Sequence, residues 1–276
     1  MDVLVVNDDG IDAPGIRELA ALARTLGRVF VVAPREVQSG ASHRVSLSWP
    51  LRVERRDDVP GAEAAYAVAG SPADCVSLAL GCLLPDRPGL VLSGINAGFN
   101  VGFDVAYSGT VAAAMEAAMR GVPAVAFSQT KVAADYSLAR GCFPRVMDEL
   151  LSRPARTDGV WNVNIPGCGA GHARGVLFDR STAAADLRPI LGAERVELGE
   201  SGAGGQGRPD GAPRVAAGED APAAGEGAHE RGAGGFGVRM LVGPVDVEAN
   251  ARDVSSDIGA VCADYVSVSW VRGPIG

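Results

Sequence analysis

The chain has 276 residues, of which 47% are hydrophobic and 21% are charged, with a formal net charge of −8 at pH 7. These proportions are typical of a globular protein with ample core, and they exclude a disordered chain. The acidic balance disfavours a nucleic acid duplex or an anionic membrane as partner, and no apolar run approaches the ~20 residues that a transmembrane helix needs.

In chain order, the first two thirds of the sequence alternates strands with helices. The predicted strands are short apolar runs at Asp2–Asn7, Arg28–Pro34, Leu90–Gly94, Pro123–Ser128 and Val160–Pro166, with broken extended chain at Val45–Val68. The predicted helices run from Pro14 to Gly27, from an N-cap at Ser71, from Thr110 to Gly121 and from Tyr136 to Leu151. This alternation predicts βαβ units and an α/β fold, a Rossmann-like three-layer sandwich with a mostly parallel sheet.

The C-terminal third differs in composition. Residues Gly199–Gly237 are dominated by Gly, Ala, Pro and acidic residues and contain no Leu, Ile, Tyr or Trp. Such a stretch cannot bury enough apolar surface to offset the entropy of ordering it. We therefore expect residues 1–198 to form the α/β core, residues 199–237 a flexible insertion, and residues 238–276 a smaller irregular and β region whose strands and helix complete the domain.

Cysteine usage and the N-terminus both favour a cytoplasmic protein. The five cysteines are scattered and form no CxxC pair, which is typical of reduced thiols. The apolar run Val3–Val6 is too short for a signal peptide, and the acidic Asp2 precedes it.

Polar side chains follow three of the predicted strands, where ligands of a parallel sheet bind. These are Asn7, Asp8 and Asp9 after the first strand, Gln38, Ser39, Ser42 and His43 after the second, and Ser93, Asn96 and Asn100 after the third. Carboxylate, hydroxyl and amide oxygens without Cys or His suit Mg²⁺, Mn²⁺ or Ca²⁺ rather than zinc. By itself, the NDDG sequence is equally typical of a solvated helix N-cap.

A second feature is the stretch Ser108-Gly109-Thr110 at the start of an Ala-rich helix. Free backbone N–H groups and the helix dipole make such a start a natural phosphate site, although a serine or threonine there also serves as a simple cap. Because the paired acids and this helix start occur together, the sequence indicates metal-assisted hydrolysis of a phosphate ester.

Several stretches together resemble the SurE family of metal-dependent nucleotide phosphatases, the 5'/3'-nucleotidases. They occur in the family's order and are Asn7–Gly10, Val31–Ser42, Gly70–Val76, Leu90–Gly102, Tyr107–Ser128 and Trp161–Pro166. The resemblance implies an enzyme that hydrolyses nucleoside 5'-monophosphates, and 3'-monophosphates as a further class, to nucleoside and phosphate by metal-activated water. It also implies a homodimer or homotetramer.

The resemblance further implies roles for individual residues. One divalent ion, Mg²⁺ or Mn²⁺, is expected on Asp8, Asp9, Ser39 and Asn96. Asp8 or Asp9 acts with the metal to activate water, and Asn96 takes part in catalysis. The implied phosphate contacts are Asn96, Ser108, Gly109 and Thr110, with Asn7 lining the site.

We also expect Gly40, His43 and Asn100 to border the substrate. His43 is either a general acid that protonates the leaving alcohol or a solvent-facing loop histidine, and we place it at the rim of the site. The family usually carries an ordered β-hairpin in its C-terminal half. Here the Gly199–Gly237 segment takes its place, which leaves the assembly and the substrate-selecting wall open.

Three other functions fit parts of the pattern. A haloacid-dehalogenase-type phosphatase needs two acids separated by one residue, whereas Asp8 and Asp9 are adjacent. A non-catalytic metal- and nucleotide-binding module has no reason to keep the full ligand set. A phosphatase for a specialised metabolite phosphate keeps the chemistry, and its selectivity would reside in the C-terminal half that departs from the family.

Overall fold

The computed structural model describes residues 1–130, 135–167, 173–182, 190–196, 237–242, 250–251 and 253–273. The chain divides into two compact units, one formed by Met1–Leu187 with Asp246–Gly276 and the other by Arg188–Val245. The predicted insertion Gly199–Gly237 lies outside the described residues, except for Gly237 itself.

The first unit is built on one large sheet. Its strands are β1 Asp2–Val6, β2 Arg28–Pro34, β3 Val53–Arg56, β4 Ala64–Val68, β5 Leu90–Ala97, β6 Ala124–Gln129, β7 Gly159–Ile165, β8 Gly175–Arg180 and β11 Tyr265–Arg272. The order across the sheet is β3-β4-β2-β1-β5-β6-β7-β11-β8. Only the β3–β4 and β7–β11 pairs are antiparallel, so the expectation of a mostly parallel sheet is confirmed.

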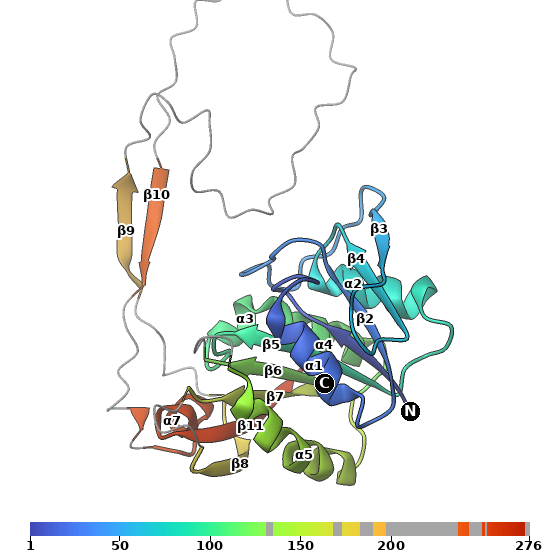
Figure 1. The fold of residues 1–276 in the computed structure, drawn as a ribbon. Helices are drawn as coiled ribbons and strands as arrows, with labels where there is room; N and C mark the ends of the chain where they lie inside the picture. The colour runs from blue at the N-terminus through green and yellow to red at the C-terminus, as the bar shows by residue number, and fades with distance from the viewer. Residues whose placement is uncertain are drawn as a thin grey trace, which may run out of the picture. The chain divides into compact units, whose positions relative to one another are not determined.

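Helices cover both faces of this sheet (Figure 1). They are α1 Pro14–Ala23, α2 Pro72–Leu78 with a π-helical turn at Ala79–Leu83, α3 Asp104–Tyr107, α4 Gly109–Met119, α5 Ser137–Ser152 and α7 Asp257–Cys262. Val3 and Val5 of β1 pack with α1 and α5, whereas Leu4 and Val6 pack with α2 and α4. Alternate residues of one strand thus pack into two separate cores, one on each face of the sheet. The central strands are therefore apolar throughout. The three-layer α/β architecture is confirmed.

The second unit contains an antiparallel pair, β9 Ile190–Val196 and β10 Gly237–Val242. Gly237 pairs with Val196, and Val238 with Arg195. That the Gly-rich segment takes the place of the family's β-hairpin stays a prediction. Two paired strands are present, and they come from the residues on either side of that segment.

Most element boundaries agree with the sequence-based expectations, and the exceptions have local causes. Ser71 caps α2 as expected, and Asp74 completes a reciprocal capping box with it. The first helix ends at Ala23, short of the predicted Gly27, because Thr25 and Leu26 continue as turns. The short elements α3 and β8 were not predicted. Among the described residues, no helix has both the length and the apolar character that crossing a membrane requires.

Candidate active site

The turn that follows β1 lies in the interior of the sheet, because β1 has β2 on one side and β5 on the other. Asn7 is fully buried, and its Nδ2 donates to the Gly10 carbonyl at 2.8 Å. Gly10 has φ +98°, a left-handed conformation that side chains disfavour. The backbone therefore turns sharply and presents the acid pair at the carboxyl edge of the sheet, where α/β proteins bind ligands.

Asp8 is 4% exposed and lies against the first turn of α4. The Thr110 hydroxyl donates to its Oδ1 at 2.5 Å. The backbone of Gly109 is so close that a Cβ there would lie 2.8 Å from the Asp8 Cβ and 3.0 Å from its Oδ2. Only glycine leaves room for this contact, which explains the residue type at the helix start.

Burial dominates the electrostatics of Asp8. It raises the pKa of the carboxyl from its usual 3.8 to about 6, the Thr110 hydrogen bond acts against that rise, and the neighbouring charge of Asp9 adds to it. Among the described residues, no basic side chain forms an ion pair with Asp8. At neutral pH its negative charge is therefore stabilised by neutral hydrogen-bond donors such as Thr110, without a basic side chain of the described residues.

Asp9 connects the acid pair to β5. Its Oδ2 accepts a hydrogen bond from the Ala97 backbone N–H at 3.1 Å. Asn96, the neighbouring residue, is half-buried, and its Nδ2 donates to the Gly98 carbonyl at 3.0 Å. The Asp9 contact thus brings the end of β5, with Asn96, to the turn after β1.

Ser39 reaches the same place on the loop after β2. The Gln38 backbone N–H donates to the Asp8 carbonyl at 2.7 Å, so Ser39 follows a residue fixed to the acid turn. Its side chain is exposed. The loop is also tied to α3, because the Ser42 hydroxyl donates to the Ala106 carbonyl at 2.8 Å. All three polar strand ends predicted from the sequence therefore meet at one edge of the sheet.

The start of α4 has the features of an anion site. Ser108 caps the helix, with its Oγ accepting from the Val111 N–H at 3.1 Å. Gly109 and Thr110 occupy the first helical positions, where backbone N–H groups lack partners within the helix. The positive end of the helix dipole lies at the same point. The cap and the anion-binding role, which the sequence left as alternatives, are compatible here.

The residues present fit a single hard cation. Asp8 is a buried carboxylate without a basic partner, and the buried Oδ1 of Asn7 has no hydrogen-bond partner in the described part of the chain. No group of three or more His, Cys, Asp and Glu side chains able to hold a metal occurs among the described residues. A site here would combine two carboxylates with neutral oxygens, which is the chemistry that Mg²⁺ and Mn²⁺ accept.

Three residues expected to border the substrate have different surroundings. Gly40 is exposed in the loop after β2, next to Ser39, with φ +70°. The Nε2 atom of His43 lies 2.9 Å from Glu116 Oε2, two turns beyond the start of α4, rather than on any predicted ligand. Asn100 is 5% exposed, and its Nδ2 donates to the Ser128 hydroxyl at 2.8 Å. The structure gives His43 and Asn100 partners in the surrounding scaffold.

Sequence reasoning missed the residues that hold Asn100. Its backbone N–H donates to Asn164 Oδ1 at 2.8 Å, and its carbonyl accepts from Asn162 Nδ2 at 2.8 Å and Asn164 Nδ2 at 3.0 Å. Both asparagines are fully buried on β7. Two amides on alternate residues of an otherwise apolar strand were the available signal, because a buried amide requires a partner.

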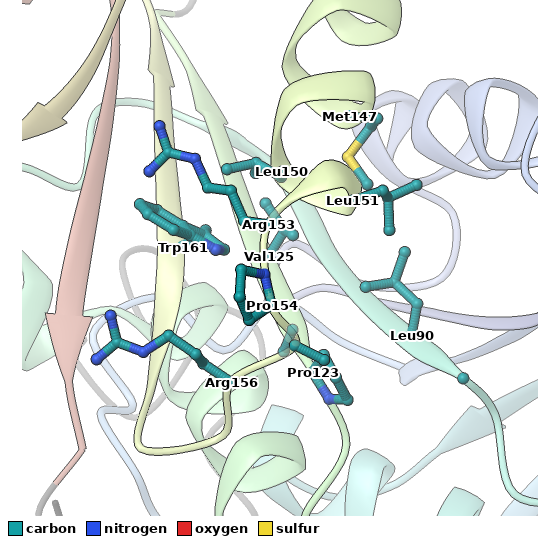
Figure 2. A pocket seen from close by; sticks show the side chains of 13 residues that line it. Leu90, Pro123, Val125, Met147, Leu150, Leu151, Arg153, Pro154, Arg156 and Trp161 are labelled. Atoms are coloured by element: carbon teal, nitrogen blue, oxygen red, sulfur yellow. The ribbon is translucent and has the colours of Figure 1, made fainter.

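A separate cavity of about 120 Å³ lies at the opposite edge of the sheet (Figure 2). The first residues of β5 and β6, with Met147, Leu150 and Leu151 from α5, contribute to its walls. Trp161 and the stems of Arg153 and Arg156 complete it. None of the predicted site residues lines this cavity, and it faces the amino ends of the parallel strands, so it is distinct from the candidate active site.

Comparison with known proteins agrees with this geometry. A family model described as "Survival protein SurE" matches residues 3–185. The 5'-nucleotidase SurE of Pelobacter propionicus is 46% identical over 183 residues, 65% of this chain and 72% of that protein. The 5'-nucleotidase SurE of Chlorobaculum tepidum is 44% identical, covering 64% of this chain and 68% of that protein. The crystal structure of the SurE protein from Aquifex aeolicus superposes with a TM-score of 0.72 at 28% identity, covering 99% of this chain and 93% of the other. The resemblance seen in the sequence is confirmed, and the chain belongs to the SurE family.

Proposed function

We propose that this protein is a phosphomonoesterase that hydrolyses nucleoside 5'-monophosphates to nucleoside and phosphate with one divalent metal ion. The observation that carries the proposal is the contact between Asp8 and the first turn of α4, where the Thr110 hydroxyl donates to the carboxylate and the Gly109 backbone leaves no room for a Cβ beside it. A cation-binding acid and an anion-binding helix start thus lie side by side, as metal-assisted phosphate chemistry requires. Relatives named 5'-nucleotidase support the substrate class.

The metal ligands in this proposal are Asp8, Asp9, Ser39 and Asn96, with Mg²⁺ or Mn²⁺ as the ion. Their support is the meeting of the three strand ends through the Asp9–Ala97 and Gln38–Asp8 contacts. When bound, the ion supplies Lewis acidity at the phosphoryl group and lowers the pKa of water.

The protein's own groups perform the remaining tasks. The N–H groups at the start of α4 and the Ser108 hydroxyl bind the phosphoryl oxygens and stabilise the negative charge that develops on them. Asp8 or Asp9 takes a proton from the attacking water. The water oxygen forms a bond to phosphorus while the ester P–O bond breaks. The protonated aspartate then returns its proton to the leaving nucleoside oxygen, which regenerates the carboxylate. Asn96 helps to orient the phosphate.

Phosphate release tests the proposal directly. The panel contains 5'- and 3'-nucleoside monophosphates and one aryl phosphate, each with Mg²⁺, Mn²⁺ or EDTA. We expect release from the 5'-nucleotides that EDTA stops and Mg²⁺ or Mn²⁺ restores, and none from an Asp9→Ala variant. Release from the aryl phosphate alone would indicate that the natural substrate is a specialised metabolite phosphate rather than a nucleotide. No release from any ester, or full activity in EDTA, refutes the proposal.

We further propose that the protein acts in the cytoplasm as a homodimer or homotetramer on a small phosphate ester, without a nucleic acid duplex or a membrane as partner. Its net charge of −8 and the free thiols of Cys75, Cys82 and Cys142 support this environment. Light scattering coupled to size-exclusion chromatography measures the assembly, and a monomer would contradict it.

A further inference from the structure

The loop that carries Ser39 is attached to the protein at several points besides the acid turn. We call residues 35–46 the Ser39 loop. Its contact with the acid turn is the Gln38 N–H on the Asp8 carbonyl at 2.7 Å. Ser39 itself is exposed, so its position beside Asp8 depends on what anchors the rest of the loop. Ser42 ties the loop to α3, with its hydroxyl on the Ala106 carbonyl at 2.8 Å and its N–H on the Tyr107 carbonyl at 3.1 Å. Two buried carboxylates, one on α4 and one on α2, provide further anchors.

The first anchor is Glu116 on α4, which is 7% exposed. Its Oε2 lies 2.9 Å from His43 Nε2 in the Ser39 loop. Its Oε1 accepts from the Ser77 hydroxyl of α2 at 2.7 Å and from Arg120 Nε at 2.6 Å. These hydrogen bonds, His43 first, lower the pKa of Glu116 to about 2 and keep it ionised. The Glu116 carboxylate, itself on α4, is therefore also bound to α2 and to Arg120, independently of its contact with the loop.

The second anchor is Asp74 in the capping box of α2, which is 2% exposed. Its Oδ1 accepts from the Ser46 backbone N–H at 2.8 Å, and its Oδ2 accepts from the Ser46 hydroxyl at 2.8 Å. The N-cap Ser71 hydroxyl donates to the Arg44 carbonyl at 2.5 Å. The end of the Ser39 loop is thus bound to a helix terminus that packs in the same core as α4.

We propose that Glu116, acting through His43, is a positioning residue that holds the Ser39 loop in its metal-binding conformation. Asp74 fixes the far end of the same loop through Ser46. Because the helix that presents Glu116 also begins with the phosphate site, one rigid element sets the distance between the metal-binding loop and the bound phosphate. This inference rests on the proposed function, since it assigns what supports the metal site rather than the site itself. Partners behind metal ligands commonly change metal affinity 10–100-fold when removed.

A His43→Leu variant tests the proposal, because leucine is close to the imidazole in size and cannot donate to Glu116. We expect Mn²⁺ affinity, measured by titration calorimetry, to fall about 10-fold. Hydrogen exchange at the Gln38 and Ser42 amides, measured without metal, should become faster, because the loop no longer holds these N–H groups against the Asp8 and Tyr107 carbonyls. His43→Gln retains an N–H donor and should restore both values towards wild type.

The matched control is Ser77→Ala, which removes a hydrogen bond from the same carboxylate without touching the Ser39 loop. We expect wild-type Mn²⁺ affinity and wild-type exchange in the loop. Wild-type Mn²⁺ affinity in His43→Leu, or an equal loss in His43→Leu and Ser77→Ala, overturns the positioning role. If the wild-type protein takes up no Mn²⁺, the proposed function fails, and unchanged exchange at Gln38 in His43→Leu then also refutes the anchoring of the loop.

Discussion

Ionisation of the Asp8 carboxyl lowers the stability of the folded, metal-free protein. Its pKa is raised from 3.8 to about 6 by burial, so between these values the folded state binds more protons than the unfolded state. Stability therefore falls as the pH rises through this window. A shift of this size corresponds to about 3 kcal/mol at neutral pH. A bound cation would offset this loss of stability. The free energy gained in this way contributes to the affinity of the site for the metal.

An Asp8→Asn substitution should therefore stabilise the metal-free protein while abolishing metal binding. Asparagine keeps an oxygen for the Thr110 hydroxyl but carries no charge. In EDTA at pH 7.5 we expect the melting temperature to rise above that of the wild type, and at pH 4 the gain should disappear. Thermal unfolding at the two pH values measures this. A variant less stable than the wild type at pH 7.5 would show that the charge of Asp8 is already compensated.

A Thr110→Val substitution keeps the Asp8 carboxyl but removes the hydrogen bond that stabilises its ionised form. The Thr110 hydrogen bond lowers the pKa of Asp8, so its loss should raise that pKa further. We expect the pH at which Mn²⁺ binding is half lost on acidification to move upward, and kcat/KM at pH 7 to fall about 10–100-fold. Thr110→Ser keeps the hydroxyl and serves as the control. An unchanged pH profile in Thr110→Val would contradict the assignment.

At the scale of elements, the junction of β1 and α4 depends on a missing side chain. The Cβ of alanine at Gly109 would lie 2.8 Å from the Asp8 Cβ and 3.1 Å from Pro72 Cγ, so either the helix start or the acid turn must move. Since displacements of this order in a catalytic site can cost about 100-fold, we expect Gly109→Ala to lower kcat/KM by about that factor. Steady-state kinetics with saturating Mn²⁺ measures it.

The control for this prediction is Gly141→Ala in α5, where the added Cβ meets no atom within 4 Å. An alanine in an exposed helix interior should stabilise the protein by about 0.5–1 kcal/mol and leave the kinetics unchanged. Equal kinetic losses in the two variants would mean that Gly109 acts through general stability rather than through Asp8.

Elements with a strong local signal were predictable from the sequence. The strand Arg28–Pro34 has the predicted bounds because a continuous apolar run ends at a proline, and Ser71-Pro72 marked the start of α2. The four-residue helix α3 carries too little periodicity for such a prediction. The last residues expected in the first helix form turns instead, because Leu26 packs on the core without helical geometry.

The candidate site divides along the same line. The acid pair and the Ser108-Gly109-Thr110 start are each contiguous, so a motif could reveal them. The contact between His43 and Glu116 joins residues 73 positions apart, and Asn100 meets Asn164 across 64. No spacing rule links such pairs, and only the packing of the loop on α4 and β7 brings them together. That is why a rim position for His43 was a reasonable expectation and Glu116 was not considered.

At the scale of the whole molecule, the first unit has its own two cores and its own candidate site. We propose that residues 199–237 are an insertion that this unit does not need. Gly237 pairs directly with Val196, so a two-residue Asn-Gly turn can replace residues 197–236 and join the two strands. We expect kcat/KM within about twofold of the wild type and an unchanged melting temperature. A variant that loses substrate affinity would give the insertion a role in recognition.

The position of β11 has a consequence for how the chain is made. This strand fills the place between β7 and β8, yet it follows β7 by about 100 residues. On a ribosome adding 5–20 residues per second, the open edge of β7 therefore waits roughly 5–20 s for its neighbour. An unpaired edge is a template for association with other nascent chains. Premature termination between Ile165 and Tyr265 would leave that edge exposed permanently, so such incomplete products should be prone to aggregation and dependent on chaperones.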